Sequence, residues 1–462
     1  MKKIKLNIED FFNIPTAVIY NPDYLKSIYH VSIDSRKIRK NSLFIAIKGE
    51  RLDGHTFIDS AVKNGADAVM INDKYLRKIN DYNITVITVK DTTVALGEIA
   101  KIWRAKLKTK IIGITGSAGK TTTKEILADL LCEKFKVNKT SANQNNHIGV
   151  PLTVLSTNEK DDVLVAELGT NHFDEIAYTA AIVKPDLALI TNIGDSHLEF
   201  LRNRKGVFKE KSSLLKETII NRGKIFINND DPILSAFGKK VKNKTTFALN
   251  RPADYKASIK GYDKLARPMV EIKSKEKKIN VLLPLSGEKN VLNFTSAYAI
   301  ASELGLSDNQ LTKAVTRLKS YNKRLEIKNH KKFTLINDTY NANPDSMKSA
   351  LDILSRINNR KRKIAILGDM FELGSESKNK HLELADVIND ADVDEVYTIG
   401  KMMKSLDKKL NGAAKIHKHF NERDSLKKLL ASLNINNSVL LVKGSRGMKM
   451  EEFVSVIESS NK

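Results

Sequence analysis

The chain of 462 residues is long enough for about three domains of ~150 residues each, and 41% of its residues are hydrophobic, which suffices for packed cores. No apolar stretch reaches the length needed to cross a membrane, and Glu9 and Asp10 interrupt any signal-peptide core behind the basic first residues. The single cysteine, Cys132, excludes an intrachain disulfide and is typical of a reducing compartment. The composition therefore predicts a cytoplasmic protein without membrane insertion.

The chain is strongly basic, with 78 Lys and Arg against 54 Asp and Glu and a formal net charge of +24. Such a charge attracts nucleic acid, an anionic membrane or polyanionic small substrates. The lysines are scattered through every segment, however, without the interleaved aromatic residues that single-strand binders use. We therefore interpret most of them as solvated surface and expect no nucleic-acid partner. A nucleic-acid-dependent ATPase remains the alternative, and its activity would depend steeply on salt.

The first 108 residues contain a strand-like run at 43–49 and a short helix at 57–64 that Gly65 closes. Ser35 and Arg36 precede the strand, and Arg36 offers a planar fork of donors that suits a phosphate. The turn at 53–55 follows the strand. Its residues, like Ser35 and Arg36, are either ligand contacts or ordinary turn residues. A domain boundary is expected near Thr109.

A glycine-rich turn at 115–120 joins an apolar run at 111–114 to a helical pattern at 121–131. Gly116 and Gly119 leave backbone N–H groups free to converge on phosphate oxygens at the positive end of the helix. Lys120 would then reach the β- and γ-phosphates, with a threonine hydroxyl facing Mg²⁺. Ile114 replaces the first glycine of the usual G-x-x-x-x-G-K-[ST] motif, and a glycine-rich turn in an exposed loop is the alternative interpretation.

Polar side chains follow the next predicted strands. The loop at 140–151 is rich in asparagine and predicts either a ligand-binding loop or a capping cluster ahead of a helix near 152–155. Glu167 ends one apolar run, and His197 follows the next. Because the carboxyl ends of parallel strands meet at one sheet edge, Glu167 and His197 should converge with Thr121 around bound nucleotide and Mg²⁺.

The remaining segments complete an α/β fold of three domains. Residues 109–320 read as a central phosphate-loop domain, a mostly parallel sheet with helices on both faces, which includes β-hairpins at 255–285 and an apolar helix at 287–301. Residues 1–108 form a small α/β N-terminal domain. Beyond a second boundary near 321–326, strands at 334–337, 363–367, 395–399 and 438–442 alternate with helices, which predicts a Rossmann-like α/β C-terminal domain at 321–462.

From about Ser35 to Met450 these motifs together resemble the Mur ligase family, the ATP-dependent amide-bond-forming enzymes of peptidoglycan precursor synthesis. The phosphate loop, the asparagine-rich loop and the two strand ends mark the family at large. Segments 338–344, 367–370 and 443–449 are most similar to the member that adds D-alanyl-D-alanine to UDP-N-acetylmuramoyl-tripeptide through an acyl phosphate. We do not find the Asp-Asn-Pro-Arg motif of the diaminopimelate-adding neighbour.

The resemblance implies ATP and Mg²⁺ as cofactors and assigns residues to each ligand. ATP would contact Gly116, Ser117, Ala118, Gly119, Lys120, Thr121, Thr122, Asn290, Asn293, Arg324, Asp338, Tyr340 and Asn341. The substrates UDP-N-acetylmuramoyl-tripeptide and D-alanyl-D-alanine would contact Ser35, Arg36, Gly49, Asp53, Gly54, His55, Asn143, Asn145, Asn146, Asn343, Ser346, Lys443, Ser445 and Arg446. The metal ligands would be Thr121, Glu167, His197 and Lys211, and the catalytic residues Lys120, Lys211 and His197.

Lys211 resembles the lysine that the family carbamylates, with Ser213 in place of the family's glutamate. The modification is chemically reasonable because an ammonium repels Mg²⁺, whereas a carbamate presents oxygens and a negative charge. Three further positions depart from the family pattern: Lys289 replaces a histidine, Thr339 a serine and Ala142 a glycine.

Two further alternatives stay open at this point. One is a member of the same family that acts on another amino acid or on folate. The other is a binding protein in which ATP only orders an interface, so that hydrolysis is slow and unchanged by UDP-linked peptides. The sequence is also taken to indicate a monomer.

Overall fold

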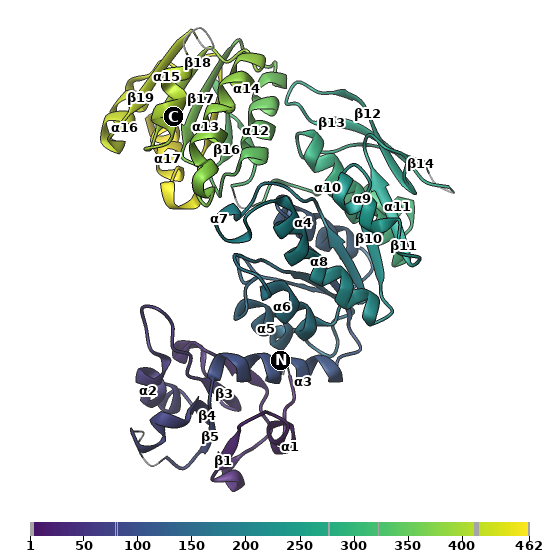
Figure 1. Cartoon of the computed structure of the whole chain (residues 1–462), viewed down its shortest axis with the longest axis vertical. Helices are drawn as coiled ribbons and strands as arrows, with labels where there is room; N and C mark the ends of the chain where they lie inside the picture. Colours follow the sequence, from purple (N-terminus) through teal and green to yellow (C-terminus); the bar gives the residue numbers. More distant parts are fainter. Residues whose placement is uncertain are drawn as a thin grey trace.

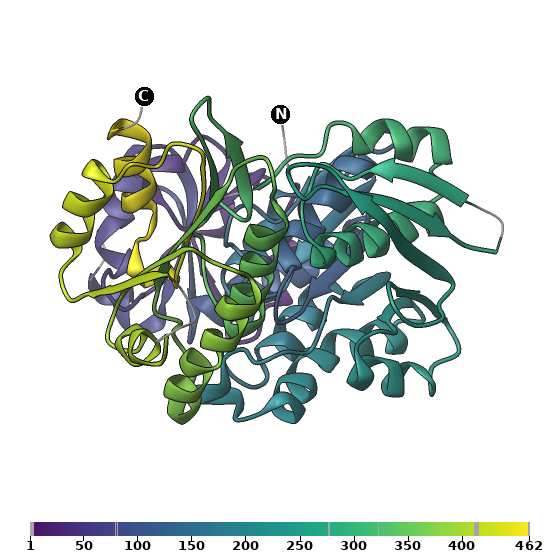
Figure 2. The same ribbon diagram turned by 90° about the horizontal axis from the view of Figure 1, so that it is seen from above.

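The computed structural model describes residues 4–460 apart from 79, 81, 276, 277, 322 and 411–414, and its strands form three sheets. The predicted α/β class is confirmed, and one sheet falls within each predicted domain range. The lobes that carry the first and third sheets extend to the same side of the central lobe, which gives the molecule a crescent shape (Figures 1 and 2). No helix in the described part of the chain is long and apolar enough to span a membrane.

The N-terminal sheet has the strand order β1-β5-β4-β3-β2, in which only β1 runs antiparallel to its neighbour. Its strands are β1 (Val18–Tyr20), β2 (His30–Ser32), β3 (Ser42–Ile45), β4 (Ala66–Asn72) and β5 (Thr85–Val89). Its helical segments are α1 (Ile8–Phe12), η1 (Pro22–Tyr24), η2 (Ser35–Lys37), η3 (Gly54–Phe57), α2 (Ile58–Lys63) and η4 (Asp73–Lys78). Gly65, at φ +95°, ends the predicted helix as expected for a left-handed position.

Helix α3 (Thr92–Lys106) joins the N-terminal sheet to the central domain and packs on both. One hydrophobic core runs from Leu43 and Met70 in the first sheet, through Trp103 in α3, to Leu164 in the central sheet. The Trp103 indole also donates a hydrogen bond of 3.0 Å to the Thr157 carbonyl. The first two lobes are therefore joined by continuous packing across the boundary near 109.

The central sheet has nine strands in the order β14-β13-β12-β11-β10-β9-β6-β8-β7, parallel from β7 to β12 and antiparallel in its last two strands. The strands are β6 (Lys110–Thr115), β7 (Val137–Lys139), β8 (Val163–Glu167), β9 (Leu187–Ile190), β10 (Lys224–Asn228), β11 (Lys244–Ala248), β12 (Tyr255–Tyr262), β13 (Pro268–Lys273) and β14 (Lys278–Leu282). The helices are α4 (Lys120–Leu131), α5 (Gly149–Ser156), α6 (Glu175–Val183), α7 (Leu198–Leu201), α8 (Arg204–Ile220), α9 (Pro232–Gly238), α10 (Glu288–Glu303) and α11 (Asp308–Val315).

Both faces of the central sheet are covered, because its strands alternate between two cores. Ile111 packs on the face covered by α5, α6 and α8, whereas Ile112 and Ile114 pack on the face covered by α4 and α10. The phosphate-loop turn thus follows a strand that is buried beyond Lys110, and it leads into a helix on one defined face of the sheet. This geometry directs the first turn of α4 toward the third lobe (Figure 1).

The C-terminal sheet has the order β15-β16-β20-β17-β18-β19 and is parallel except for β15. Its strands are β15 (Glu326–Asn329), β16 (Phe333–Asp338), β17 (Arg362–Gly368), β18 (Glu395–Ile399), β19 (Ile416–Phe420) and β20 (Ser438–Lys443). Its helical segments are α12 (Pro344–Arg356), η5 (Gly374–Glu376), α13 (Ser377–Leu382), α14 (Leu384–Asp390), α15 (Met403–Lys409), α16 (Arg423–Ser432), η6 (Arg446–Met448) and α17 (Glu451–Ser460). The edge strands β15 and β19 were not predicted, because their side chains are mostly polar and half-exposed.

Candidate active site

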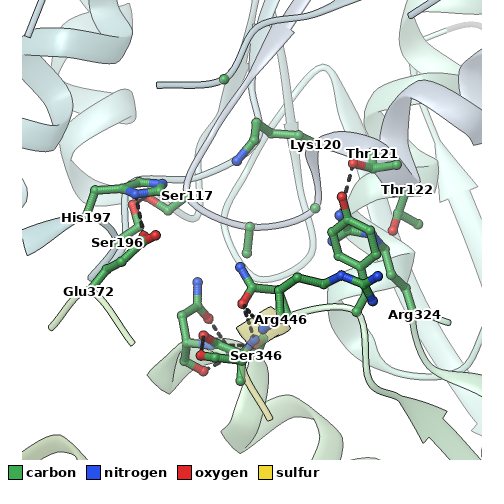
Figure 3. A pocket seen from close by; sticks show the side chains of 18 of the residues that line it. Ser117, Lys120, Thr121, Thr122, Ser196, His197, Arg324, Ser346, Glu372 and Arg446 are labelled. Atoms are coloured by element: carbon green, nitrogen blue, oxygen red, sulfur yellow. Dashed lines mark hydrogen bonds and ion pairs between the residues drawn. The ribbon is translucent and has the colours of Figure 1, made fainter. Parts of the chain in front are cut away.

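A cavity of about 520 Å³ lies where the central and C-terminal lobes meet (Figure 3). It gathers the carboxyl ends of central strands, the start of α4, the asparagine-rich loop and three C-terminal loops. The predicted residues that line it are Ser117, Ala118, Gly119, Lys120, Thr121, Thr122, Asn143, Asn145, Asn146, Glu167, His197, Asn290, Asn293, Arg324, Asp338, Tyr340, Asn341, Asn343, Ser346, Lys443, Ser445 and Arg446. The predicted residues outside its lining are Gly116, Lys211, Ser35, Arg36, Gly49, Asp53, Gly54 and His55.

The phosphate loop has the backbone that its glycines predict. Gly119 caps α4 at φ +82°, and a Cβ there would lie 2.6 Å from the Asn293 amide oxygen, so only glycine fits. No side chain caps α4, and the N–H groups of its first turn therefore remain available to an anion. The Lys120 ammonium lies 2.7 Å from the Gly116 carbonyl oxygen, and burial lowers the pKa of Lys120. The loop can thus cradle phosphate oxygens.

Glu167 is buried beside the first turn of α4 and has two differently placed oxygens. Its Oε1 accepts hydrogen bonds from the Thr121 hydroxyl at 3.0 Å and the Asn145 amide at 2.9 Å. Its buried Oε2 has no hydrogen-bond partner. Among the described residues, no group of three or more His, Cys, Asp or Glu could hold a metal ion by itself. Glu167 and Thr121 nevertheless suit Mg²⁺, which usually takes one or two carboxylates and completes its shell with phosphate and water.

His197 reaches the same cavity from the start of α7 and faces the C-terminal lobe (Figure 3). Its Nδ1 lies 2.7 Å from Glu372 Oε2, and this contact lowers the pKa of Glu372. Both residues have left-handed backbones, at φ +52° and +63°. Glu372 was missed as a site residue, because only the packing of the two lobes brings its loop to His197.

The C-terminal lobe supplies cations to the cavity. Lys443 is buried and pairs with Asp338 at 2.5 Å, and Arg324 lies over the Tyr340 ring at 3.9 Å while donating to the Thr121 hydroxyl at 3.2 Å. Lys289, from α10, donates to the Asp345 carbonyl across the interface between the lobes at 2.5 Å. Arg324 thus joins the C-terminal lobe to the start of α4, and Lys289 joins that lobe to α10.

Asn343 and Ser346 line the cavity but also cap α12. The Asn343 amide oxygen accepts from the Ser346 N–H at 2.8 Å, and the Ser346 hydroxyl accepts from the Asn343 N–H at 3.0 Å. Each side chain therefore satisfies a free donor at the start of the helix. Phe371, Ser196 and Thr170 also line the cavity without having been predicted as site residues.

Lys211 lies inside α8, apart from the cavity lining, and is fully buried. Its Nζ has no hydrogen-bond partner, and burial, together with the charge of Lys120, lowers the pKa of Lys211 well below its usual value. Its neighbour Glu210 accepts the N–H groups of Asp174 and Ile176 at 2.7 Å and so caps α6. A buried, unpartnered amine of this kind is able to act as a nucleophile.

The predicted N-terminal site residues lie in the first lobe. Arg36 is exposed and its guanidinium pairs with Asp34, whereas Ser35 is buried. His55 is also buried, with Nε2 accepting the Asn72 N–H at 3.0 Å and Nδ1 therefore donating to Asp53 at 2.6 Å. Both ring nitrogens are used within the lobe, so His55 shapes the turn from inside.

The carboxylate of Asp53 makes the stability of this lobe depend on pH in the acidic range. Burial raises its pKa, but hydrogen bonds from Tyr75 and His55 outweigh that effect and lower the pKa to about 2. A carboxyl group with a depressed folded pKa stabilises the fold above its unfolded pKa of 3.8 and loses this contribution as the pH falls toward about 2. Asp53→Asn should therefore flatten the pH dependence of the free energy of unfolding in this window. Denaturant titrations at several pH values measure this, and an unchanged slope would contradict the contacts.

Comparison with known proteins gives concordant results. Three family models match the chain: the Mur ligase family catalytic domain at 27–104, the Mur ligase middle domain at 114–301 and the Mur ligase, glutamate ligase domain at 323–446. The UDP-N-acetylmuramoyl-tripeptide--D-alanyl-D-alanine ligase of Bacillus subtilis (strain 168) is 34% identical over 466 residues, covering 99% of each chain.

Solved structures agree with this result. A crystal structure of MurF from Acinetobacter baumannii is 28% identical with a TM-score of 0.88, covering 99% of this chain and 100% of that one. MurF ligase from Thermotoga maritima in complex with ADP is 28% identical with a TM-score of 0.82, covering 93% of this chain and 97% of that one. The three-lobed architecture is thus shared along nearly the whole chain.

Proposed function

Because the chain belongs to the Mur ligase family, we propose that it joins D-alanyl-D-alanine to UDP-N-acetylmuramoyl-tripeptide at the expense of ATP, in peptidoglycan precursor synthesis. The observation that carries this proposal is the single cavity in which the phosphate loop, Glu167 and the cationic C-terminal loops meet. The three segments most similar to this member, around Asp338, Asp369 and Lys443, all lie at the carboxyl ends of strands of the C-terminal sheet.

The reaction proceeds in two displacements. A terminal carboxylate oxygen of the tripeptide attacks the γ-phosphorus of ATP, and ADP leaves. The amine of D-alanyl-D-alanine then attacks the acyl carbon, the phosphate leaves and the amine loses a proton. Lys120 and the N–H groups at the start of α4 hold the triphosphate and oppose the charge that builds between its β- and γ-phosphates. Positioning and electrostatics therefore supply most of the acceleration.

Mg²⁺ fits beside the phosphate loop, where the Thr121 hydroxyl and Glu167 would hold it and where it would neutralise phosphate charge. Glu167 Oε2, buried without a hydrogen bond, supports this assignment. His197 is the third proposed ligand from the same cavity.

Lys211 is proposed to carry a carbamate. Its neutral amine attacks CO₂, a C–N bond forms and a proton leaves, which converts a buried amine into a carboxylate-like group. The full burial of Nζ without a hydrogen-bond partner supports this modification.

The UDP end of the substrate is proposed to bind the N-terminal lobe, through Ser35, Arg36, Gly49 and the turn at 53–55. The exposed Arg36 guanidinium is the direct phosphate contact in this proposal, and the buried His55 acts by fixing the turn. Action as a monomer is also part of the proposal, and the use of ATP and a UDP-linked substrate supports a cytoplasmic location.

Phosphate release tests the function directly. With UDP-N-acetylmuramoyl-tripeptide and ATP, release should depend strongly on D-alanyl-D-alanine and should yield the pentapeptide product. Faster reaction with a single amino acid would indicate another member of the family. Slow hydrolysis that UDP-linked peptides leave unchanged would indicate a nucleotide-ordered binding protein, and stimulation by DNA or RNA would indicate a nucleic-acid-dependent ATPase.

A further inference from the structure

Lys124 is a second lysine of the phosphate-loop helix, one turn beyond Lys120, and its side chain is completely buried. Thr121 and Thr123 precede it among the buried residues of the helix, and the buried residues that follow it are all aliphatic: Ile126, Leu127, Ala128, Leu130 and Leu131. Burying an ammonium costs several kcal/mol unless it is paired, and an apolar residue of similar volume often serves stability equally well. A buried cation at this position therefore calls for a role that packing alone does not explain.

Lys124 contacts Glu167 in two ways, directly and through Thr140. Its Nζ donates to the Thr140 carbonyl at 2.7 Å and lies 3.0 Å from Glu125 and 3.7 Å from Glu167 Oε2. The Thr140 hydroxyl in turn accepts the Glu167 N–H at 2.9 Å. One ammonium thus holds the Glu167 carboxylate directly and holds, through Thr140, the backbone that carries it.

The two oxygens of Glu167 consequently face different environments. Oε1 is bound by Thr121 and Asn145, which both line the cavity, whereas Oε2 accepts no hydrogen bond and lies 3.7 Å from the Lys124 ammonium. Thr140 is also the first residue of the asparagine-rich loop that supplies Asn145. Lys124 therefore links the phosphate-loop helix, the end of β8 and the start of this loop.

We propose that Lys124 is a positioning residue that holds Glu167 and the asparagine-rich loop in register with the phosphate loop, so that Glu167 is aimed at a nucleotide-bound divalent cation. This inference rests on the proposed function, because it takes Glu167 as a metal ligand. Residues that orient a metal ligand typically change metal affinity about 10- to 100-fold when they are removed.

The test measures metal binding separately from activity. Mn²⁺ binding to the protein with ADP is titrated by electron paramagnetic resonance, and ADP binding is titrated in EDTA. Lys124→Met should weaken Mn²⁺ binding about 10- to 100-fold and leave ADP binding in EDTA unchanged. Unchanged Mn²⁺ affinity would overturn the proposal, as would an equal loss of both affinities or a lower melting temperature as the sole effect.

Matched variants separate the partners of Lys124. Lys139→Met removes the half-exposed lysine that pairs with Glu125 at 2.5 Å, and it should leave Mn²⁺ affinity as in the wild type. Thr140→Val removes the hydroxyl that accepts the Glu167 N–H and should weaken Mn²⁺ binding in the same direction as Lys124→Met. Thr140→Val thus keeps the proposal testable if Lys124→Met does not fold, and wild-type affinity in Thr140→Val would contradict it.

The wild type distinguishes this proposal from the proposed function. If the wild-type protein binds Mn²⁺ with ADP and ligates the two substrates, a normal Lys124→Met variant refutes the role of Lys124 alone. If the wild-type protein neither binds Mn²⁺ with ADP nor ligates, the proposed function itself fails.

Discussion

Lys120→Ala is expected to lower the turnover number of ligation by about 10²- to 10³-fold or more, because the variant loses the cation at the developing charge between the β- and γ-phosphates. The neighbouring side chains of the loop cannot replace it, since Ser117, Thr121 and Thr122 are neutral. Helix α4 still offers its N–H groups, so nucleotide binding should weaken less than turnover. Single-turnover phosphate release with both substrates measures the chemical step separately from product release.

The fold should survive this substitution. The ammonium of Lys120 makes one hydrogen bond, to the Gly116 carbonyl, and a hydrogen bond from a charged donor is worth about 1.5–3 kcal/mol. Lys216→Ala, on the exposed side of α8, removes the same charge from the same domain and should retain wild-type turnover. Near-normal phosphate release by Lys120→Ala, with its melting temperature preserved, would refute the assignment of the phosphate loop.

The strand, glycine turn and helix around Lys120 could be predicted from the sequence for a local physical reason. A glycine at φ +82°, a lysine and a threonine lie within three residues, between a strand and a helix that are each visible from their apolar spacing. Glu167 and His197 were also predicted to share one cavity with Thr121, because parallel strands end at one edge of their sheet. These predictions needed no knowledge of how the lobes pack.

Contacts between lobes could not be predicted in the same way. The pairing of His197 with Glu372 joins residues that are far apart in the chain, and it depends on how the third lobe sits on the second. The core that joins Met70, Trp103 and Leu164 likewise runs through a boundary that the sequence places between separate domains. Strand β19 could not be predicted either, because its residues are mostly polar and it forms by pairing with the neighbouring strand β18.

The structure shows the local environment of two residues that depart from the family pattern, Ala142 and Lys289. Ala142 has φ +45°, a left-handed backbone in which glycine is free of strain, which accounts for the family's usual residue there. Lys289 donates a hydrogen bond to the Asp345 carbonyl and thereby joins α10 to the start of α12, so its side chain stabilises the interface between the lobes. Burial at this interface lowers the pKa of Lys289.

Lys211→Ala is expected to abolish most ligation and to regain part of it in formate, acetate or propionate. The reason lies in the environment of the amine, which is fully buried, has no hydrogen-bond partner and has its pKa lowered by burial and by Lys120. A carbamate built on this amine would place a carboxylate in the space that alanine leaves open, and a small carboxylic acid can enter that space. Bicarbonate should rescue poorly, because alanine offers no amine for CO₂.

Direct detection separates the carbamate from a packing role. Carbon-13 NMR of the wild type equilibrated with labelled CO₂ should give a carbamate resonance that Lys211→Ala lacks and that Lys216→Ala, on the same helix, retains. A variant inactive only because of a packing defect would show no carboxylate rescue and a lower melting temperature. Full activity of Lys211→Ala without any added acid would exclude the carbamate from the reaction, because no other described lysine on α8 is buried in this way.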